Sequence, residues 1–220
     1  SKEEREHIAE RLGGHPLALL LYQQETDLPE ANSEVQSYVE EVVLSTLDET
    51  TRSELDHLVI LPMPIEASKA QDDEIVGILD ESAFLRWTSG AEKMELQHLI
   101  RNVRRSTMTE QEKLKLHCEA VTHWESCAQT PEDQIILLYH RICSDTQDLE
   151  AHCTTAYGSL PSEHSNALSV LLEQAIERSH EPSHLHYLAA KVALDRCESR
   201  HARHHLESIR EEGSFNEIEM

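Results

Sequence analysis

The apolar residues after His98 recur at a helical spacing, and this pattern constrains the fold more than any other feature of the sequence. Prolines, glycines and polar residues interrupt it at short intervals, which predicts amphipathic helices joined by short turns. The predicted helices cover residues 109–127, 131–144, 147–157, 161–179, 183–196 and 199–212. Short connections between helices of this length favour antiparallel helical hairpins.

The composition agrees with a mainly helical fold. Six glycines and seven prolines are too few for the turns of an all-β chain of 220 residues, and only 4% of the residues are aromatic. No apolar run is long enough to span a membrane and no signal peptide is recognisable, so we expect a cytoplasmic protein. The five cysteines are irregularly spaced and include no CxxC pair, which predicts free thiols.

Residues 46–107 follow a different order of patterns. A helix is expected after a cap at Asp48, then a short helix in "MPIEASKAQ" and another helix in "DDEIVGILDESAFL". Apolar and polar residues then alternate on both sides of Ser89–Gly90, which predicts a two-stranded hairpin before the helix that begins near His98. Three helices with a two-stranded wing in this order form a winged helix, so we predict a winged-helix domain here.

The stretch "RLGGHPLALLL" near the N-terminus combines a glycine pair with a proline and an apolar run. Glycine pairs often end helices and proline fits the first turn of a new one, so two helices should meet at Gly13–Gly14. One interpretation is a buried helix–turn–helix corner, and the other is a place where the backbone approaches a ligand.

The order of these motifs resembles the C-terminal part of a STAND-class ATPase, the signal-transduction class that includes the NB-ARC and NACHT proteins. "GGHPLAL" is similar to the GLPLA or GxP motif of the helical lid in that class, and "LQHLIR" is similar to the L-H-x-L-I-R segment after its winged helix. The resemblance implies lid helices over 1–45, a winged helix over 46–107, helices similar to tetratricopeptide repeats (TPR) over 108–212, and a flexible tail over 213–220.

The same resemblance implies residues that contact a nucleotide. Pro16 would lie against the adenine and Gly14 would let the backbone come close, although Pro16 also suits a plain first turn of a helix. The histidine that senses phosphate in this class aligns with Gln97, and His98 follows one position later. Glutamine can donate to a phosphate oxygen without charge, and the alternative for His98 is a helix-start residue at the base of the wing.

The sequence contains no G-x-x-x-x-G-K-[ST] motif and no apolar strand that ends in paired acids. We therefore expect no catalytic residues and no bound cofactor in this chain. ATP or ADP would bind to an upstream nucleotide-binding domain of a parent ATPase. This chain would act as a regulatory region that packs on that domain and binds a protein partner through its helices.

The charge of the chain disfavours nucleic acid as a partner. Forty-two acidic residues against nineteen basic ones give a net charge of −23, which repels phosphate backbones and fits a halophilic, archaeal source. Asp72, Asp73 and Glu74 begin the helix that would enter a DNA groove. A basic cluster still leaves a winged-helix DNA-binding regulator as the alternative. It consists of Arg86, Lys93, Arg101, Arg104 and Arg105.

Two further hypotheses concern the last helices. Cys197, His201 and His205 are spaced at i, i+4 and i+8, so a metal site is conceivable with His184 and His186 nearby, but a turn near Ser199 would break that face. His123 and Cys127 could form a thiol–imidazole pair, for which a packed thiol beside a surface imidazole is the simpler interpretation. Apolar rows that the helices do not cover predict self-association or further repeats.

Overall fold

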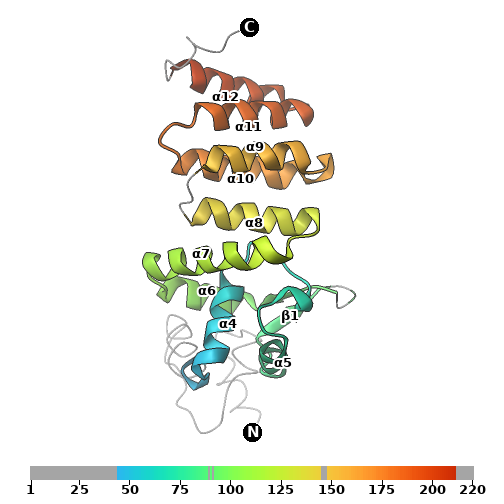
Figure 1. The fold of residues 1–220 in the computed structure, drawn as a ribbon, viewed down its shortest axis with the longest axis vertical. Coiled ribbons are helices and arrows are strands. Elements are labelled where there is room, and N and C mark those ends of the chain that lie inside the picture. Colours follow the sequence, from blue (N-terminus) through green and yellow to red (C-terminus); the bar gives the residue numbers. More distant parts are fainter. Residues whose placement is uncertain (1–43, 89, 91, 145–147, 212–220) are drawn as a thin grey trace, which may run out of the picture. The chain divides into compact units, whose positions relative to one another are not determined.

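The computed structural model describes residues 44–88, 90, 92–144 and 148–211, and Figure 1 shows its fold. The described part is mainly helical with one two-stranded antiparallel sheet, which confirms the predicted fold class. The chain forms two compact units, residues 1–116 and 117–220, which we call unit 1 and unit 2. The predicted lid helices with Gly14 and Pro16, and the predicted tail at 213–220, lie outside the described residues, and the predicted domain limits stay predictions.

The elements of unit 1 follow the predicted order of helices and strands. They are η2 (Leu44–Thr46), α4 (Glu49–Val59), η3 (Ala67–Lys69), α5 (Asp73–Glu81), β1 (Leu85–Trp87), β2 (Met94–Leu96) and α6 (His98–Thr107). The boundary between the units falls within α7 (Glu110–Cys127).

The elements of unit 2 are helices separated by short turns. They are α8 (Pro131–Cys143), α9 (Leu149–Ser159), η4 (Ser162–His164), α10 (Ser165–Arg178), α11 (Ser183–Asp195) and α12 (Ser199–Glu211). The predicted helix over 161–179 is therefore a short 3-10 turn followed by α10.

Polar side chains fix where the helices begin. Asp48 Oδ1 accepts the backbone N–H of Thr51 at 2.8 Å, which confirms the predicted cap of α4. Asp72 caps α5 in the same way. Pro131 occupies the first turn of α8 after a reciprocal capping box between Thr130 and Asp133.

The hairpin of unit 1 pairs Leu85 with Leu96, Arg86 with Glu95, and Trp87 with Met94. Gly90 in its turn has φ of 96°, a conformation that glycine adopts without steric cost. The sequence did not predict that Ile65 extends the sheet by an isolated bridge to Met94, with N···O distances of 3.0 and 2.7 Å.

The core of unit 1 is aliphatic and comes from both helices and strands. Its fully buried side chains are Leu55, Leu79, Met94, Leu96 and Ile100, together with Leu44. At its edge, the guanidinium of Arg104 on α6 donates to both carboxylate oxygens of Asp56 on α4, at 2.7 and 2.9 Å. This bidentate pair joins two helices that are far apart in the sequence.

Helices of unit 2 pack against their neighbours in two rows. In one row α9 lies against α11, in the other α8 lies against α10, and α11 packs on both α10 and α12. Small residues make the close contacts of α11, where Ala189, Ala190 and Ala193 are buried. Most leucines of these helices are buried, among them Leu168, Leu172 and Leu185, whereas Leu194 is 56% exposed.

Candidate functional site

Gln97 and His98 lie where β2 meets α6. The Gln97 side chain donates from Nε2 to the carbonyl oxygen of Leu85 at 3.3 Å, and its backbone N–H donates to Phe84 at 2.8 Å. Gln97 therefore supports the base of the hairpin in this structure. His98 is the first residue of α6 and is exposed. Its position agrees with a helix-start residue, and contact of either residue with a phosphate stays a prediction.

Much of the predicted basic cluster of unit 1 is paired with acids. Arg86 and Arg101 both contact the carboxylate of Glu95, and Arg104 contacts Asp56. Pairing with carboxylates reduces the positive charge that these side chains could offer to a phosphate backbone. Most of these arginines thus hold the unit together.

The three candidate metal ligands near the C-terminus do not share one helix face. Cys197 lies in the turn before α12 with φ of 60°. Nδ1 of the exposed His201 lies 3.1 Å from Oε2 of Glu198. His205, one turn after His201, is buried against His186 of α11. Within the described residues, no group of three or more His, Cys, Asp or Glu side chains could hold a metal ion.

Unit 2 instead contains two buried pairs of imidazoles. Nδ1 of His117 lies 2.9 Å from Nδ1 of His140, and Nδ1 of His186 lies 3.1 Å from Nδ1 of His205. Each pair joins two consecutive helices, α7 to α8 and α11 to α12. The sequence placed all four residues on helices, but the partner of each depends on how the helices pack.

Glu173 on α10 adds a carboxylate to the His186–His205 pair, and its Oε1 lies 3.1 Å from Nε2 of His205. A carboxylate at this distance favours a proton on Nε2, so Nδ1 of His205 accepts from Nδ1–H of His186. Burial lowers the pKa of His205; the Glu173 carboxylate opposes this effect, and the neighbouring histidines reinforce it. Burial therefore favours the neutral form of His205, which can accept the hydrogen bond from His186.

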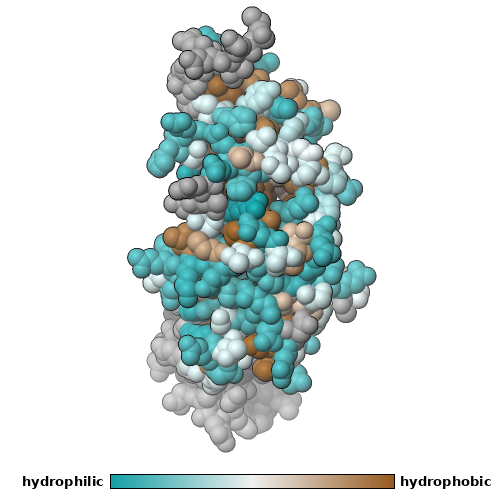
Figure 2. Space-filling model, viewed as in Figure 1, coloured by the Kyte–Doolittle hydropathy of each residue, from teal (hydrophilic) through white to brown (hydrophobic). Residues whose placement is uncertain are grey.

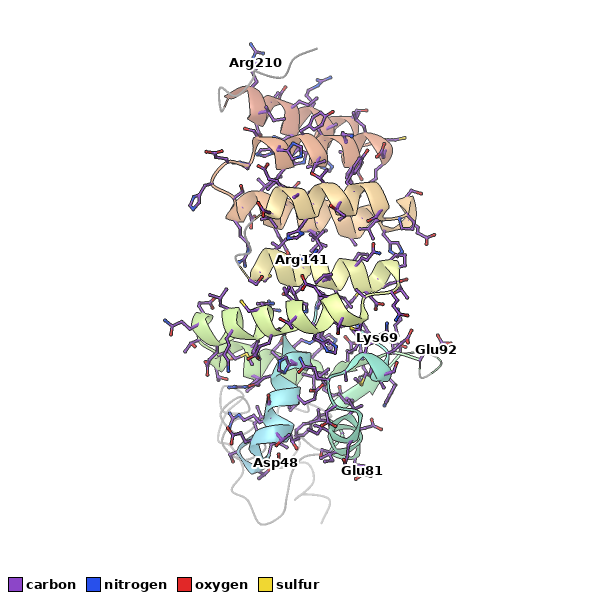
Figure 3. All side chains as sticks on the ribbon, in the orientation of Figure 1. Asp48, Lys69, Glu81, Glu92, Arg141 and Arg210 are labelled. Atoms are coloured by element: carbon purple, nitrogen blue, oxygen red, sulfur yellow. The ribbon has the colours of Figure 1, made fainter. Side chains whose placement is uncertain are left out.

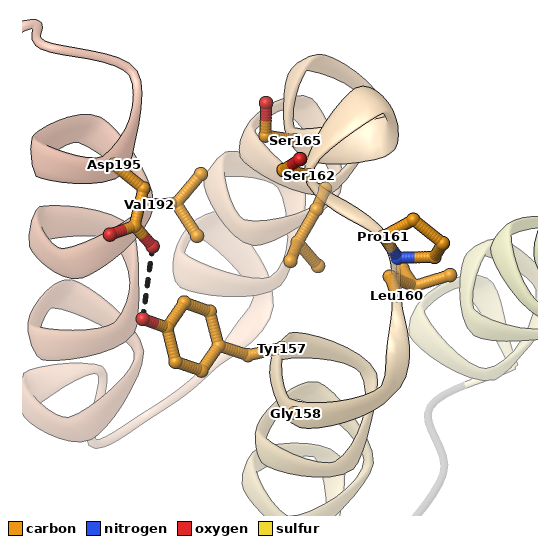
Figure 4. Close-up of a pocket in the computed structure, with 9 residues that line it drawn as sticks. Tyr157, Gly158, Leu160, Pro161, Ser162, Ser165, Val192 and Asp195 are labelled. Carbon is orange, nitrogen blue, oxygen red and sulfur yellow. Dashed lines mark hydrogen bonds between the residues drawn. The ribbon is translucent and has the colours of Figure 1, made fainter.

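A pocket of about 570 Å³ opens in unit 2 where α9, α10 and α11 meet (Figure 4). Apolar side chains form much of its wall, and Leu168 and Val192 among them are buried. At its edge, the hydroxyl of Tyr157 donates to Oδ2 of Asp195 at 3.0 Å. The pocket therefore combines apolar walls with one carboxylate and the hydroxyls of Ser162 and Ser165.

An exposed row of side chains continues from this pocket along α9 and α11. Nζ of Lys191 lies 4.5 Å from the ring centroid of Tyr157 and 5.6 Å from that of Tyr187, in cation–π geometry. One turn further, Thr154 and His184 are joined at 3.0 Å. Tyr187 is 44% exposed, so this face presents aromatic surface to solvent. We call the row from Thr154 and His184 to the pocket the α9–α11 face.

The rest of the described surface is mostly hydrophilic. The side of the molecule in Figure 2 shows hydrophilic residues with small hydrophobic patches between them. Charged side chains also connect neighbouring helices, as where Arg141 on α8 (labelled in Figure 3) donates to Glu125 on α7 at 2.8 Å. Among the described residues, no helix has both the length and the apolar character needed to cross a bilayer.

The fold is similar to that of a crystallised protein from Pyrococcus horikoshii. That protein is described as a Signal Transduction ATPase with Numerous Domains (STAND) that has a tetratricopeptide repeat sensor. The TM-score is 0.63 at 16% sequence identity, and the match covers 95% of this chain but only 32% of the other. No protein-family model and no curated protein matches the sequence. The likeness therefore concerns the fold, and the chain spans about a third of that STAND protein.

Proposed function

We propose that this chain is the non-catalytic regulatory and protein-interaction region of a STAND-type nucleotide-switch protein. The observation that carries the proposal is the similarity of nearly the whole chain to part of a STAND protein with a TPR sensor. The motifs "GGHPLAL" and "LQHLIR" are in the order expected for such a region. The parent protein would bind ATP or ADP through a domain that this sequence lacks.

In this proposal unit 1 carries a winged helix that packs on the nucleotide-binding domain. The element order α4, α5, β1, β2, α6 supports a winged helix, and the internal pairing of Arg86, Arg101 and Arg104 favours packing on protein over binding to DNA. Gln97 and His98 lie next to each other at the start of α6, where a phosphate-sensing segment would be needed.

Unit 2 would bind the partner or signal of the switch. Stacked helical hairpins commonly bind peptides along one row of helices. The α9–α11 face supports this role, because it offers exposed Tyr187, the half-buried Tyr157 and a pocket. Aromatic side chains are enriched where proteins bind one another.

The gene that encodes the chain gives the first test. An in-frame G-x-x-x-x-G-K-[ST] motif before Ser1, followed by nucleotide binding to the whole gene product, supports the proposal. A reading frame without such a motif overturns it. The 220-residue chain alone should show no ATP turnover above a buffer blank, and turnover that survives repurification would contradict its non-catalytic role.

Site-specific photo-crosslinking in the source cells tests the partner-binding face. A crosslinker at position 187 on α11 should give a protein adduct, whereas one at Val170, exposed on α10, should not. Equal adducts at both positions, or an adduct at position 170 alone, would exclude the α9–α11 face as the binding surface.

A further inference from the structure

Asp195 is the only charged residue among those that line the pocket. It is the last residue of α11, where the helix dipole disfavours a carboxylate. Its Oδ2 accepts from the Tyr157 hydroxyl, and among the described residues no donor contacts Oδ1. Burial raises the pKa of Tyr157, and the hydrogen bond to Asp195 and the charge of its carboxylate act in the same direction. The pocket is thus electronegative and has an unused acceptor.

Two helix ends add to this negative potential. Tyr157 and Gly158 come from the last turn of α9, and Val192 and Asp195 come from the last turn of α11. The helix dipole gives both ends partial negative charge, which favours a cation. The hydroxyls of Ser162 and Ser165 can accept further hydrogen bonds from it.

Lys191 does not form an ion pair with Asp195. Lys191 is one helical turn before Asp195, a spacing at which opposite charges often pair. Its ammonium nevertheless lies over the rings of Tyr157 and Tyr187, and these two residues form no ion pair in the structure. The carboxylate therefore remains available to an incoming group.

The walls of the pocket fit the aliphatic part of a long side chain. Leu168 is 3% and Val192 2% exposed, and Leu160 and Pro161 complete the apolar lining. A volume of about 570 Å³ is within the range of small ligand sites. A side chain with an apolar stem and a charged head could bury the stem here and place the head at the rim.

We propose that the pocket binds an arginine side chain of a partner protein, with the guanidinium on Asp195 and the stem against Leu168 and Val192. This inference rests on the proposed interaction role of unit 2, to which it adds the chemistry of the partner. Arginine fits better than lysine because its planar head donates five hydrogen bonds in fixed directions, which matches a carboxylate flanked by hydroxyls.

Titration of the full chain with short peptides, followed by the backbone amide resonances of Tyr157, Ser162 and Val192, tests the inference. The probe is acetyl-Gly-Arg-Gly-amide, and the comparisons are its citrulline and glutamate analogues. The arginine peptide should give saturable shifts at these amides. The neutral citrulline peptide should bind about tenfold more weakly, because it lacks the charge-assisted bond to Asp195.

One substitution in the pocket and one beside it give opposite predictions for the arginine peptide. Asp195→Asn keeps an acceptor for the Tyr157 hydroxyl but removes the charge, so binding should weaken about tenfold. Lys191→Met removes a positive charge beside the pocket that repels the guanidinium, and it should tighten binding about two- to threefold. Glu177→Gln on α10 removes one exposed charge outside the pocket and should change little. The dispersion of the amide spectrum shows whether each variant is folded.

Several results would overturn the inference: no saturable shift, equal binding of the citrulline peptide, tighter binding of the glutamate peptide, or Lys191→Met weakening the arginine complex. The proposed function is tested separately. A crosslink at position 187 without arginine binding removes only the arginine inference, whereas arginine binding by a chain whose gene lacks a P-loop removes only the STAND assignment.

Discussion

The two compact units bury different kinds of titratable groups. In unit 1 the buried one is the carboxylate of Glu54, and the half-buried Asp56 on the same helix is paired with Arg104. In unit 2 most of them are the imidazoles of the pairs His117–His140 and His186–His205, and the one buried carboxylate among its described residues is Asp133 in the capping box of α8. Burial raises the pKa of the Glu54 carboxyl in unit 1 and lowers the pKa of the His205 imidazole in unit 2. These two groups should therefore change the stability of their units in opposite directions as the pH falls from neutral.

Glu54 contributes to the pH response of unit 1. Burial raises the pKa of its carboxyl, although the backbone N–H of Gln71, which donates to Oε1 at 3.1 Å, opposes the shift. A pKa above the unfolded value means that the folded unit holds the proton more tightly. The contribution of Glu54 to stability is complete below the unfolded value near 4.5 and is lost as the pH rises through the folded pKa.

His205 and His152 determine the response of unit 2. Burial lowers the pKa of both imidazoles, with Glu173 opposing the shift at His205 and Asp148 opposing it at His152. A folded pKa below the unfolded value means that the unfolded chain binds more protons. Their contribution is present above the unfolded value near 6.5 and is lost as the pH falls through the folded pKa.

The chain has one tryptophan in the described part of each unit, which allows the units to be followed separately. Trp87 is on β1 in unit 1, and Trp124 is buried on α7 in unit 2. In a Trp124→Phe background the fluorescence reports unit 1, and in a Trp87→Phe background it reports unit 2. Urea unfolding of the full chain in these two backgrounds is the measurement for the predictions below.

The largest effect should come from breaking the ion pair of unit 1. Arg104→Met leaves the carboxylate of Asp56 without its partner at a half-buried position, which should cost unit 1 about 3 kcal/mol of unfolding free energy. The transition of Trp124 in unit 2 should move much less. Arg105→Met, which removes an exposed arginine next in sequence, is the control. Equal losses for the two variants would show that the Asp56 pair does not hold α4 to α6.

A change from pH 7.5 to pH 5.5 should have the next largest effect, and it should act on unit 2. Protonation of His205 on Nδ1 places that N–H against the Nδ1–H of His186, so the urea midpoint reported by Trp124 should fall. The midpoint reported by Trp87 should stay constant or rise. A larger loss in unit 1 than in unit 2 would contradict the comparison.

His205→Asn tests whether titration of the His205 ring causes the acid-induced loss, because the hydrogen bond at this position can be kept. Asparagine can still bond to His186 but does not titrate, so the acid-induced loss in unit 2 should become smaller than in the parent chain. His180→Asn removes an exposed histidine between α10 and α11 and should leave the pH dependence unchanged. If His180→Asn flattens the pH profile as much, the buried pair is not its origin.

The smallest expected effect is that of Glu54→Gln in unit 1. Glutamine keeps an oxygen that can accept from Gln71 and removes the buried charge, so unit 1 should gain up to about 1 kcal/mol at pH 7.5. The gain should vanish as the pH approaches the unfolded value near 4.5. A loss of stability at pH 7.5 would contradict this prediction, because it would mean that the negative charge of Glu54 stabilises unit 1.

Much of the local structure could be predicted from the sequence because its causes are local. Asp48 caps the helix that follows it, Pro131 lies in the first turn of α8, and Gly90 lies in the turn of the hairpin. Short-range hydrogen bonds and backbone preferences decide these features, and both can be read from adjacent residues. Less of the candidate site could be predicted from the sequence. Gln97 could be placed between the hairpin and the next helix, but its hydrogen bond to Leu85 could not be predicted.

The sequence by itself thus determined the helices, the single hairpin and the acidic surface. Only the tertiary structure decided which side chains meet. Tyr157 and Asp195 are 38 positions apart, and His186 and His205 are 19 apart, so their contacts depend on the register between packed helices. The registers of α9 on α11 and of α11 on α12 follow from how the surfaces of whole helices fit together. No local pattern encodes that fit, which is why the pocket beside Asp195 and the imidazole pairs appear only when the helices are assembled.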